Sequence, residues 1–241
     1  MSSPLRTFDF KSGIRAGSVA LCTAILISCA MNAGTDGRAL QSGAELAAYG
    51  ATGSSSLSER QKRILGAAQW ILGRTDLVVD GQRFPYDCAG TVLAIYYKAG
   101  IDLLPYFNHV TGNGVVRLYR IAQSRNLVYT TQYPRVGDVI FWDNTYDSNG
   151  DGKWDDPLTH AGVVVNVRSD GTIAYIHQNY ARGIVIEQMN LIYPAESARI
   201  EGGKTVVLNS PMRMRSQVYM NPNMVLAGQL YRDFGALYRI P

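Results

Sequence analysis

The feature that most constrains the fold of this chain is the order of its hydrophobic patterns. Apolar residues at helical spacing end near Leu72, and a continuous apolar run follows at 88–99. Beyond residue 136 the chain changes to short runs rich in valine and isoleucine, which are typical of strands. Helices first and strands afterwards predict an α+β fold, with N-terminal helices packed on a C-terminal antiparallel β-sheet.

Local signals predict where these elements begin and end. The segment Ser56-Leu57-Ser58-Glu59 predicts a capping box at the start of the first helix, and Gly73 predicts its end. The predicted helices cover residues 57–72, 88–99 and 115–125. The predicted strands cover residues 136–142, 161–167, 172–177 and 184–187, with a turn at 169–171.

The first 28 residues have the pattern of an export signal. Residues 1–15 hold three basic residues against one acid, and the apolar segment 16–28 is too short to span a bilayer. The segment Leu26-Ile27-Ser28-Cys29 resembles the lipobox of bacterial lipoproteins, whose cysteine is acylated on sulfur and becomes the new N-terminus. The resemblance implies an exported, membrane-anchored lipoprotein with Cys29 as its lipidation site, and Ala30 favours an outer membrane, facing the periplasm. An ordinary secretory signal cut elsewhere is the alternative.

Residues 29–56 are expected to form a flexible tether. Alanine, glycine and serine occupy 16 of the 27 positions from 30 to 56, so this segment cannot bury a core. One domain of moderate size is expected at 57–192, with a C-terminal extension at 193–241 that completes or flanks it. Without residues 1–28 the chain has 20 Lys and Arg against 18 Asp and Glu, and it has no basic run with interleaved aromatics. Nucleic acid is therefore not an expected partner.

Cys88 is the cysteine that the exported chain would carry free. Cys22 lies in the export signal, and Cys29 is the expected lipid attachment point. Free thiols are unusual in oxidising compartments, so nucleophilic catalysis is the strongest reason for a lone thiol there. A buried structural cysteine is the alternative. At the first turn of a helix, backbone N–H groups are expected to lower the thiol pKa and to bind an oxyanion.

Two of the three histidines are predicted to lie close together. His160 precedes the strand at 161–167, and His177 ends the strand at 172–177. The start of one strand of an antiparallel hairpin lies beside the end of the other, so both histidines fall at the same end of the sheet. A helix N-terminus packed there would bring Cys88 to His160 as its base, with His177 behind it. The alternative is that either histidine is an ordinary core or surface residue.

Three ordered motifs resemble those of the NlpC-type and CHAP cysteine hydrolases of bacterial cell walls. They are Asp87-Cys88-Ala89-Gly90, the Pro-Arg-Val-Gly-Asp-Val-Ile-Phe segment at 134–141, and the strand that begins with His160. The resemblance covers residues 58–192 and implies a papain-like fold. Ala89 stands where the family usually has a serine that contacts the substrate peptide in some relatives, and 193–241 has no clear counterpart.

The resemblance assigns roles residue by residue. It makes Cys88 the nucleophile and His160 the base. The third polar position falls on His177 in the NlpC pattern and on Asn179 in the CHAP pattern, so the subfamily stays open. The candidate substrate contacts beside the nucleophile are Tyr86 and Asp87, and Tyr86 is also a candidate contributor to the oxyanion site.

The implied activity is hydrolysis of an amide bond in peptidoglycan through a cysteine nucleophile, with no cofactor for catalysis. An endopeptidase of the stem peptide and an N-acetylmuramoyl-L-alanine amidase need the same catalytic groups, so both remain open. The expected partners are peptidoglycan and, through the lipid anchor, a membrane; no protein partner is indicated. The alternatives are a non-catalytic envelope lipoprotein that binds wall fragments or a partner protein, and a thiol acyltransferase on the same fold.

An acidic segment just before His160 resembles a calcium-binding loop. Oxygen-bearing residues alternate with others, and Gly152 stands at the sixth position, where EF-hand loops bend sharply. Position twelve holds Leu158 in place of a bidentate glutamate, for which Asp156 is the candidate replacement. A structural calcium ion is the expectation, and a hydrophilic turn without an ion is the alternative. The predicted ligands are Asp147, Asn149, Asp151, Lys153 (through its carbonyl), Asp155 and Asp156.

Overall fold

A computed structural model describes residues 57–241 of the chain. The predicted export signal, the lipidation site Cys29 and the tether lie outside these described residues. Among residues 57–241, no helix is both long enough and apolar enough to cross a membrane.

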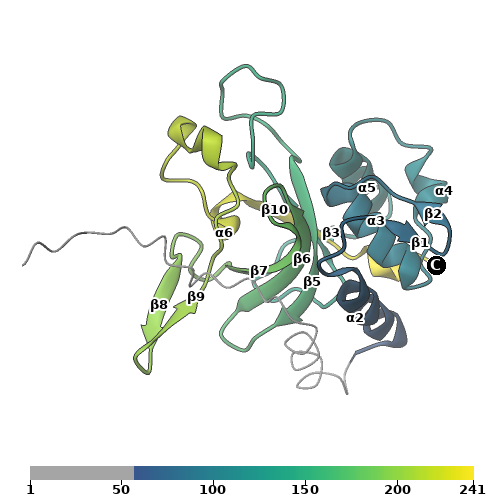
Figure 1. Ribbon diagram of the computed structural model, residues 1–241, viewed down its shortest axis with the longest axis horizontal. Coiled ribbons are helices and arrows are strands. Elements are labelled where there is room, and N and C mark those ends of the chain that lie inside the picture. The colour runs from purple at the N-terminus through teal and green to yellow at the C-terminus, as the bar shows by residue number, and fades with distance from the viewer. Residues whose placement is uncertain (1–56) are drawn as a thin grey trace, which may run out of the picture. The chain divides into compact units, whose positions relative to one another are not determined.

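A six-stranded antiparallel sheet forms the centre of the described part of the chain (Figure 1). Each strand pairs with its neighbours in antiparallel register. In sheet order the strands are β3 (Val128–Tyr129), β10 (Tyr231–Gly235), β4 (Val139–Trp142), β5 (His160–Val167), β6 (Thr172–Asn179) and β7 (Gly183–Asn190).

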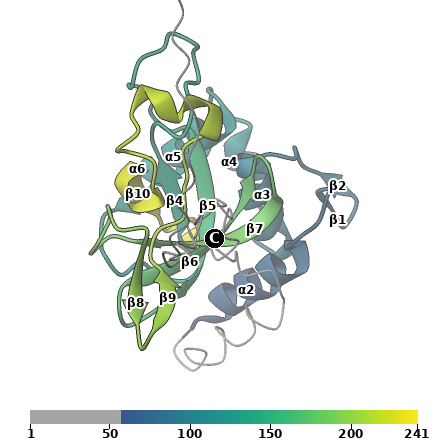
Figure 2. The same ribbon diagram turned by 60° about the vertical axis from the view of Figure 1, so that its left-hand side comes forward.

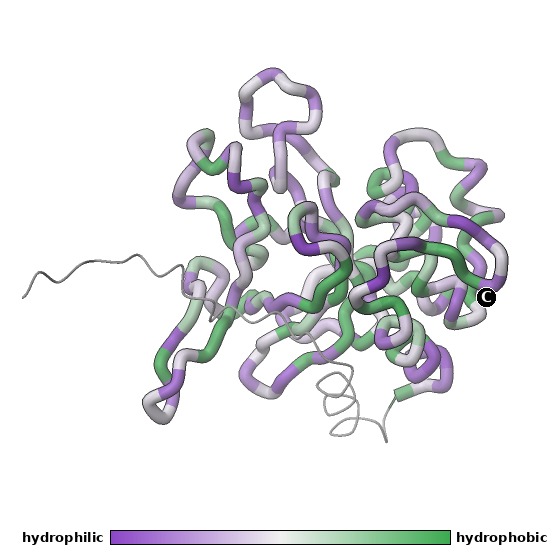
Figure 3. Tube along the Cα trace, in the orientation of Figure 1, coloured by the Kyte–Doolittle hydropathy of each residue, from purple (hydrophilic) through white to green (hydrophobic). Residues whose placement is uncertain are grey.

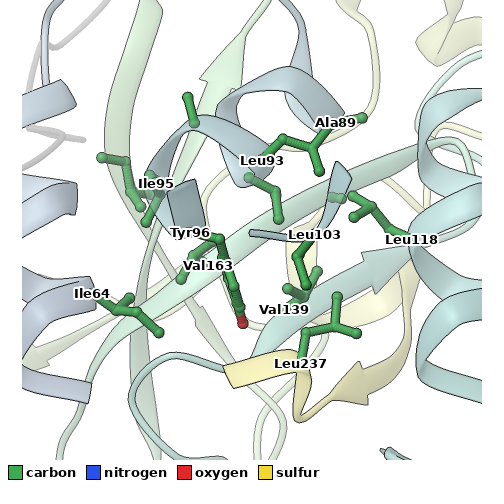
Figure 4. Packing of buried hydrophobic residues seen from close by; sticks show 14 of the residues in the cluster. Ile64, Ala89, Leu93, Ile95, Tyr96, Leu103, Leu118, Val139, Val163 and Leu237 are labelled. Carbon is green, nitrogen blue, oxygen red and sulfur yellow. The ribbon is translucent and has the colours of Figure 1, made fainter. Parts of the chain in front are cut away.

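The helices from the first half of the described chain lie on one side of this sheet, as Figures 1 and 2 show from two directions. They are α2 (Glu59–Ile71), α3 (Cys88–Lys98), α4 (Leu104–Phe107) and α5 (Gly114–Gln123). The apolar core between the helices and the sheet is drawn in Figure 4, where Leu93 of α3 and Leu118 of α5 lie near Val139 and Val163 of the sheet. This arrangement confirms the predicted α+β class: α3 and α5 pack directly on strands of the sheet, while α2 packs on α3 and α4 packs on α5.

A second apolar cluster covers the opposite face of the sheet. It contains Trp142, Tyr175 and Phe234, together with residues of the short helix α6 (Ala227–Leu230). The indole N–H of Trp142 donates to the carbonyl oxygen of Ala227 at 2.9 Å, which ties α6 to the sheet. The remaining elements are β1 (Val78–Val79), β2 (Gln82–Arg83), β8 (Ala198–Glu201), β9 (Lys204–Val207) and the 3-10 helices η2 (Arg215–Met220) and η3 (Leu237–Arg239).

The first helix begins with a different capping box from the predicted one. Ser58 is the N-cap, and its side chain accepts the N–H of Gln61. The Gln61 side chain in turn accepts the Ser58 N–H at 3.0 Å. Glutamine can fill this position of a capping box just as glutamate can. Because Ser58 is the N-cap, the helix begins at Glu59 rather than at Leu57.

The strand predicted at 136–142 begins only at Val139, because its first residues form a turn. The Asp138 carboxylate accepts the N–H of Arg135 at 2.6 Å and the hydroxyl of Tyr129. Gly137 has a φ of +88°, in the left-handed region that glycine adopts most readily. Residues 134–138 thus form a turn, held by the Asp138 carboxylate, that leads into β4.

The C-terminal segment belongs to the same core. β10 lies between β3 and β4, with Phe234 opposite both Tyr129 and Ile140. After β10, Leu237 and Ile240 are buried in the helix-side core. The sequence predicts that residues 193–241 either complete the domain or flank it. The last part of this segment adds a strand to the central sheet.

Candidate active site

Cys88 is the first residue of α3, and Asp87 is the N-cap. The Asp87 carboxylate accepts the Gly90 N–H at 2.7 Å, while its carbonyl oxygen accepts the Thr91 N–H at 2.9 Å. An aspartate in this position satisfies backbone donors that the first helical turn otherwise leaves without a partner. Asp87 therefore fixes the start of the helix that presents the thiol, a role distinct from the substrate contact predicted for it.

The two small residues after Cys88 permit close backbone approaches. A Cβ at Gly90 would overlap the carbonyl oxygen of Pro85, so the chain before the helix can fold back over it only if residue 90 is glycine. Ala89 is buried, and its Cβ would lie 2.5 Å from a Cβ at Gly114, where α5 begins. Ala89 therefore packs between two helices, which explains in structural terms why a small apolar residue replaces the serine of the family pattern.

The thiol of Cys88 is partly buried and free. Burial, followed by the negative charge of Asp87, raises its pKa to about 11, and the backbone N–H groups of Ala161, Ala89 and Cys88 offset only part of this rise. The lowered thiol pKa predicted from the helix N-terminus is therefore wrong for this resting structure, because desolvation outweighs the favourable N–H groups. The interaction with Ala161 also places the sulfur beside the first residues of β5.

His160 and His177 meet as the hairpin geometry predicted. Nε2 of His160 lies 2.8 Å from Nδ1 of His177, within hydrogen-bond distance. The two imidazole rings are nearly perpendicular, at 86°. This contact uses Nε2 of His160, so a proton transfer between His160 and a thiol would have to use its Nδ1. The pair stands on β5 and β6 at the end of the sheet against which the α3 N-terminus packs.

The two imidazoles are embedded among aromatic rings. His160 lies 5.7 Å from the Trp142 ring and His177 lies 5.2 Å from the Tyr175 ring, measured between centroids. Burial lowers the pKa of His177 to about 3, and burial with the neighbouring His177 holds the pKa of His160 well below its usual range. The resting site therefore pairs a neutral thiol with neutral imidazoles.

Glu187 of β7 is a site residue that the sequence patterns did not single out. It is 2% exposed, and its Oε2 lies 3.1 Å from Nε2 of His177. The two atoms are close but not aligned as a hydrogen bond. The available signal was a lone charge in the otherwise apolar run Ile184-Val185-Ile186-Glu187, since a buried charge in a strand requires a partner.

Asn179, the CHAP-type alternative to His177, makes its strongest contacts elsewhere. Its Oδ1 accepts the N–H groups of Ala181 at 3.0 Å and Arg182 at 3.2 Å, and it thereby closes the turn between β6 and β7. Its Nδ2 makes a long contact of 3.5 Å with Oε1 of Glu187. Of the two candidates for the third polar position, the structure brings His177 to His160, at the distance given above.

Two tyrosines lie beside the nucleophile. Tyr86 is 40% exposed, and its hydroxyl donates to the carbonyl oxygen of Arg74 at 3.0 Å, so the hydroxyl proton predicted to serve the oxyanion site is already used. Tyr146 has its phenol pKa raised by burial and next by the Cys88 thiol. Tyr146 is a second residue that the sequence patterns missed, and it places the start of the β4–β5 loop at the site.

The predicted calcium ligands lie in this β4–β5 loop, a hydrophilic segment in Figure 3. The Asp147 carboxylate accepts the N–H groups of Gly150 at 2.7 Å and Gly152 at 2.9 Å. Asn149 and Asp151 each accept the N–H two residues further on. Of the other three, Lys153 and Asp155 are exposed and Asp156 is buried.

Asp156 serves as an anchor of the loop rather than as an exposed ligand. Its Oδ1 accepts the hydroxyl of Ser148 at 2.7 Å, and its N–H donates to Oδ1 of Asn144 at 2.9 Å. Within residues 57–241, no group of three or more His, Cys, Asp or Glu side chains is arranged to hold a metal ion. Calcium binding by this loop stays a prediction.

Comparison with known proteins places this site within a family. Residues 79–179 match the CHAP domain, a stretch that contains Cys88, His160, His177 and Asn179 and ends before Glu187. Neither the curated proteins nor the solved structures gave a match to the chain. CHAP domains are usually hydrolases that act on peptidoglycan. The resemblance drawn from the sequence motifs is thus confirmed, and residues 79–179 of this chain are a CHAP domain.

Proposed function

We propose that the protein hydrolyses an amide bond of peptidoglycan through a thioester on Cys88. The observation that carries the proposal is the contact of 2.8 Å between Nε2 of His160 and Nδ1 of His177, next to a thiol that interacts with the Ala161 N–H. A nucleophile, a base and a group that orients the base are the parts that such chemistry requires. The CHAP domain match supports peptidoglycan as the substrate class.

The first half of the reaction forms the thioester. The Cys88 sulfur attacks the amide carbonyl carbon while its proton passes to Nδ1 of His160, because both groups are neutral at rest. The backbone N–H groups of Cys88 and Ala89 interact with the sulfur, and in this proposal they bind the oxyanion. When the C–N bond breaks, His160 returns the proton to the leaving amine.

The second half releases the acid. A water molecule gives a proton to Nδ1 of His160 and attacks the thioester carbonyl, and the C–S bond breaks. The sulfur then takes the proton back, so that thiol and imidazole are again neutral. The same groups serve a stem-peptide endopeptidase and an N-acetylmuramoyl-L-alanine amidase, and both belong to the proposal.

The proposed setting is the bacterial envelope. The basic and apolar pattern of residues 1–28 and the lipobox-like segment that ends at Cys29 support export and anchoring through a lipid. A chain held on the membrane by a tether at 29–56 would meet peptidoglycan from the periplasmic side. Radiolabelled palmitate incorporation that disappears in Cys29→Ala is the expected result for this anchoring.

Digestion of purified peptidoglycan by the detergent-solubilised full chain, with fragments identified by mass spectrometry, tests the activity. Fragments with new amine and carboxyl ends are expected, and the bond cut distinguishes an endopeptidase from an amidase. Cys88→Ala and His160→Ala should abolish the fragments, whereas His109→Ala, which alters an exposed histidine, should not. Peptidoglycan that is bound but left intact would favour the binding lipoprotein, and transfer to an added amine in place of water would favour the acyltransferase.

A further inference from the structure

Glu187 is a buried carboxylate surrounded by donors. On Oε2 it receives the hydroxyl of Tyr175 at 3.3 Å. On Oε1 it receives the side chain of Asn179 at 3.5 Å and forms an ion pair with Arg182. An unpaired charge at 2% exposure would be strongly unfavourable. The guanidinium and the other donors therefore mark Glu187 as an ionised, acceptor-only group.

His177 lies between this carboxylate and His160. Its Nε2 is buried 3.1 Å from Glu187 Oε2, and its Nδ1 lies 2.8 Å from His160 Nε2. Nε2 of His177 has no hydrogen-bond partner among the described residues, so Glu187 is the acceptor within reach. A neutral imidazole carries one proton, and a neighbouring carboxylate favours that proton on the nitrogen facing it.

The tautomer of His177 determines the tautomer of His160. If His177 carries its proton on Nε2, its Nδ1 can only accept, and Nε2 of His160 must donate to it. Nδ1 of His160 is then unprotonated, which is the form that can take a proton from the thiol of Cys88. The opposite tautomers would turn a lone pair of His177 toward the carboxylate and would leave His160 unable to act as a base through Nδ1.

We infer that Glu187, held ionised by Arg182, is the positioning residue that sets the tautomers of both histidines. The inference deepens the proposed function and rests on it, since it assigns His160 as the base of Cys88. Glu187 lies on β7 beyond the 79–179 stretch that matches the CHAP domain. Its negative charge also favours the positive charge that His160 gains while it holds the proton.

Nitrogen-15 NMR of the imidazoles in the intact protein tests the inference directly. The chain has three histidines, so the spectrum is simple, and the exposed His109 serves as an internal reference. At neutral pH we expect protonated Nε2 and unprotonated Nδ1 on both His160 and His177. In Glu187→Gln we expect mixed tautomers, because the amide can donate or accept. Unchanged tautomers in that variant would overturn the inference.

Activity gives a second readout. Glu187→Gln should lower peptidoglycan hydrolysis about 10- to 100-fold, the range found when a carboxylate that orients a metal-binding histidine is lost. Glu187→Asp, which keeps the charge, should recover part of the rate. Glu201→Gln makes the same chemical change on the exposed β8 and should leave the rate and the tautomers unchanged. A loss of rate in Glu187→Gln with wild-type tautomers would mean that Glu187 acts only on the fold.

Two results call for a further readout: a Glu187→Gln variant that does not fold, and a wild-type protein that shows no activity. If Glu187→Gln does not fold, Arg182→Gln removes the exposed half of the ion pair and should mix the tautomers more weakly; unchanged tautomers there would count against the inference. If the wild-type protein cleaves no peptidoglycan, the proposed function fails. The tautomer spectra still decide whether Glu187 orders the two histidines.

Discussion

Gly162 of β5 lies so close to His177 of β6 that a methyl group on Gly162 would stand 3.2 Å from His177 Cβ. The same methyl group would lie 3.0 Å from the Ile176 carbonyl oxygen and 3.3 Å from the Trp142 ring. These approaches are tighter than ordinary van der Waals contacts, so a side chain at this position would require its neighbours to move. A side chain at residue 162 would therefore crowd the backbone and the Cβ atom from which the His177 ring extends.

Gly162→Ala should lower activity more than it lowers stability. The crowding displaces His177 by a few tenths of an ångström or more, and small misplacements of catalytic groups cost up to about 100-fold in rate. Overpacking should cost about 1–3 kcal/mol of unfolding free energy. Rates of peptidoglycan hydrolysis and thermal melts measure the two effects separately.

Gly66→Ala provides the matched control for that substitution. Gly66 lies in α2, and a methyl group there would meet nothing within 4 Å. Alanine is the better helix former, so this variant should gain about 0.5–1 kcal/mol with no change in rate. A Gly162→Ala enzyme as active as Gly66→Ala would show that the histidine pair tolerates the displacement.

Asp87→Asn should make the thiol more acidic while the helix start is preserved. Burial is the largest cause of the raised pKa of Cys88, and the Asp87 charge is the second. Asparagine caps a helix about as well as aspartate, whereas Asp87→Ala should cost about 1 kcal/mol. Iodoacetamide alkylation of Cys88 across pH is the measurement, and the midpoint should fall in the asparagine variant.

The wild-type protein sets the reference for that experiment. With the pKa of Cys88 raised to about 11, its alkylation midpoint should lie well above the free-thiol value of about 8.5. A wild-type midpoint near or below neutral pH would reveal a thiolate at neutral pH. The neutral thiol–imidazole pair described here would then be the wrong resting state.

The features of this structure that depend on residues close together along the chain could be predicted from the sequence. The first turn of α3 was predictable, because Asp87 and the small residues after Cys88 act within a few positions. The meeting of His160 and His177 was predictable as well, because a short turn joins their strands. Each of these arguments needs only contacts that lie close together along the chain.

Contacts between distant segments were not predictable in the same way. β10 pairs with β3 and β4 although about a hundred residues separate them, and no local pattern in the C-terminal segment announces that pairing. Glu187 reaches His177 across the β6–β7 ladder, so its partners depend on the register of two strands. The raised pKa of Cys88 could not be predicted from the sequence either, because desolvation depends on how all the elements pack around the thiol.

Stability should depend on pH through the two buried histidines, whose pKa values are lowered, and through Asp138, whose raised pKa acts in the opposite direction. The pKa of His177 falls to about 3 in the folded protein, so its contribution to stability is present above about pH 6.5 and is lost as pH falls toward 3. Burial raises the pKa of Asp138 from 3.8 to about 6, so its contribution is present below 3.8 and is lost as pH rises through 6. The opposing contributions partly cancel in the wild-type protein.

Asp138→Asn should expose the histidine contribution alone. Its melting temperature should rise more steeply between pH 4 and pH 6 than that of the wild type, because the loss from Asp138 ionisation is removed. Asp155→Asn changes an exposed acid of the β4–β5 loop and serves as the control. Parallel melting curves for the wild type and Asp138→Asn would contradict the raised pKa of Asp138.

Calcium should raise the melting temperature of the chelator-treated protein if the β4–β5 loop binds it as its sequence predicts. The loop precedes His160, and Asp156 anchors it to Ser148 and Asn144, so an ordered loop should also hold the start of β5 in place. Activity should then follow the melting temperature rather than change independently, because the ion takes no part in the chemistry proposed for Cys88. Asp147→Asn weakens the first predicted ligand and should abolish the calcium effect, whereas Glu196→Gln, an exposed acid outside the loop, should preserve it. Equal melting temperatures with chelator and with calcium would leave the loop as a hydrophilic turn held by its own backbone N–H groups.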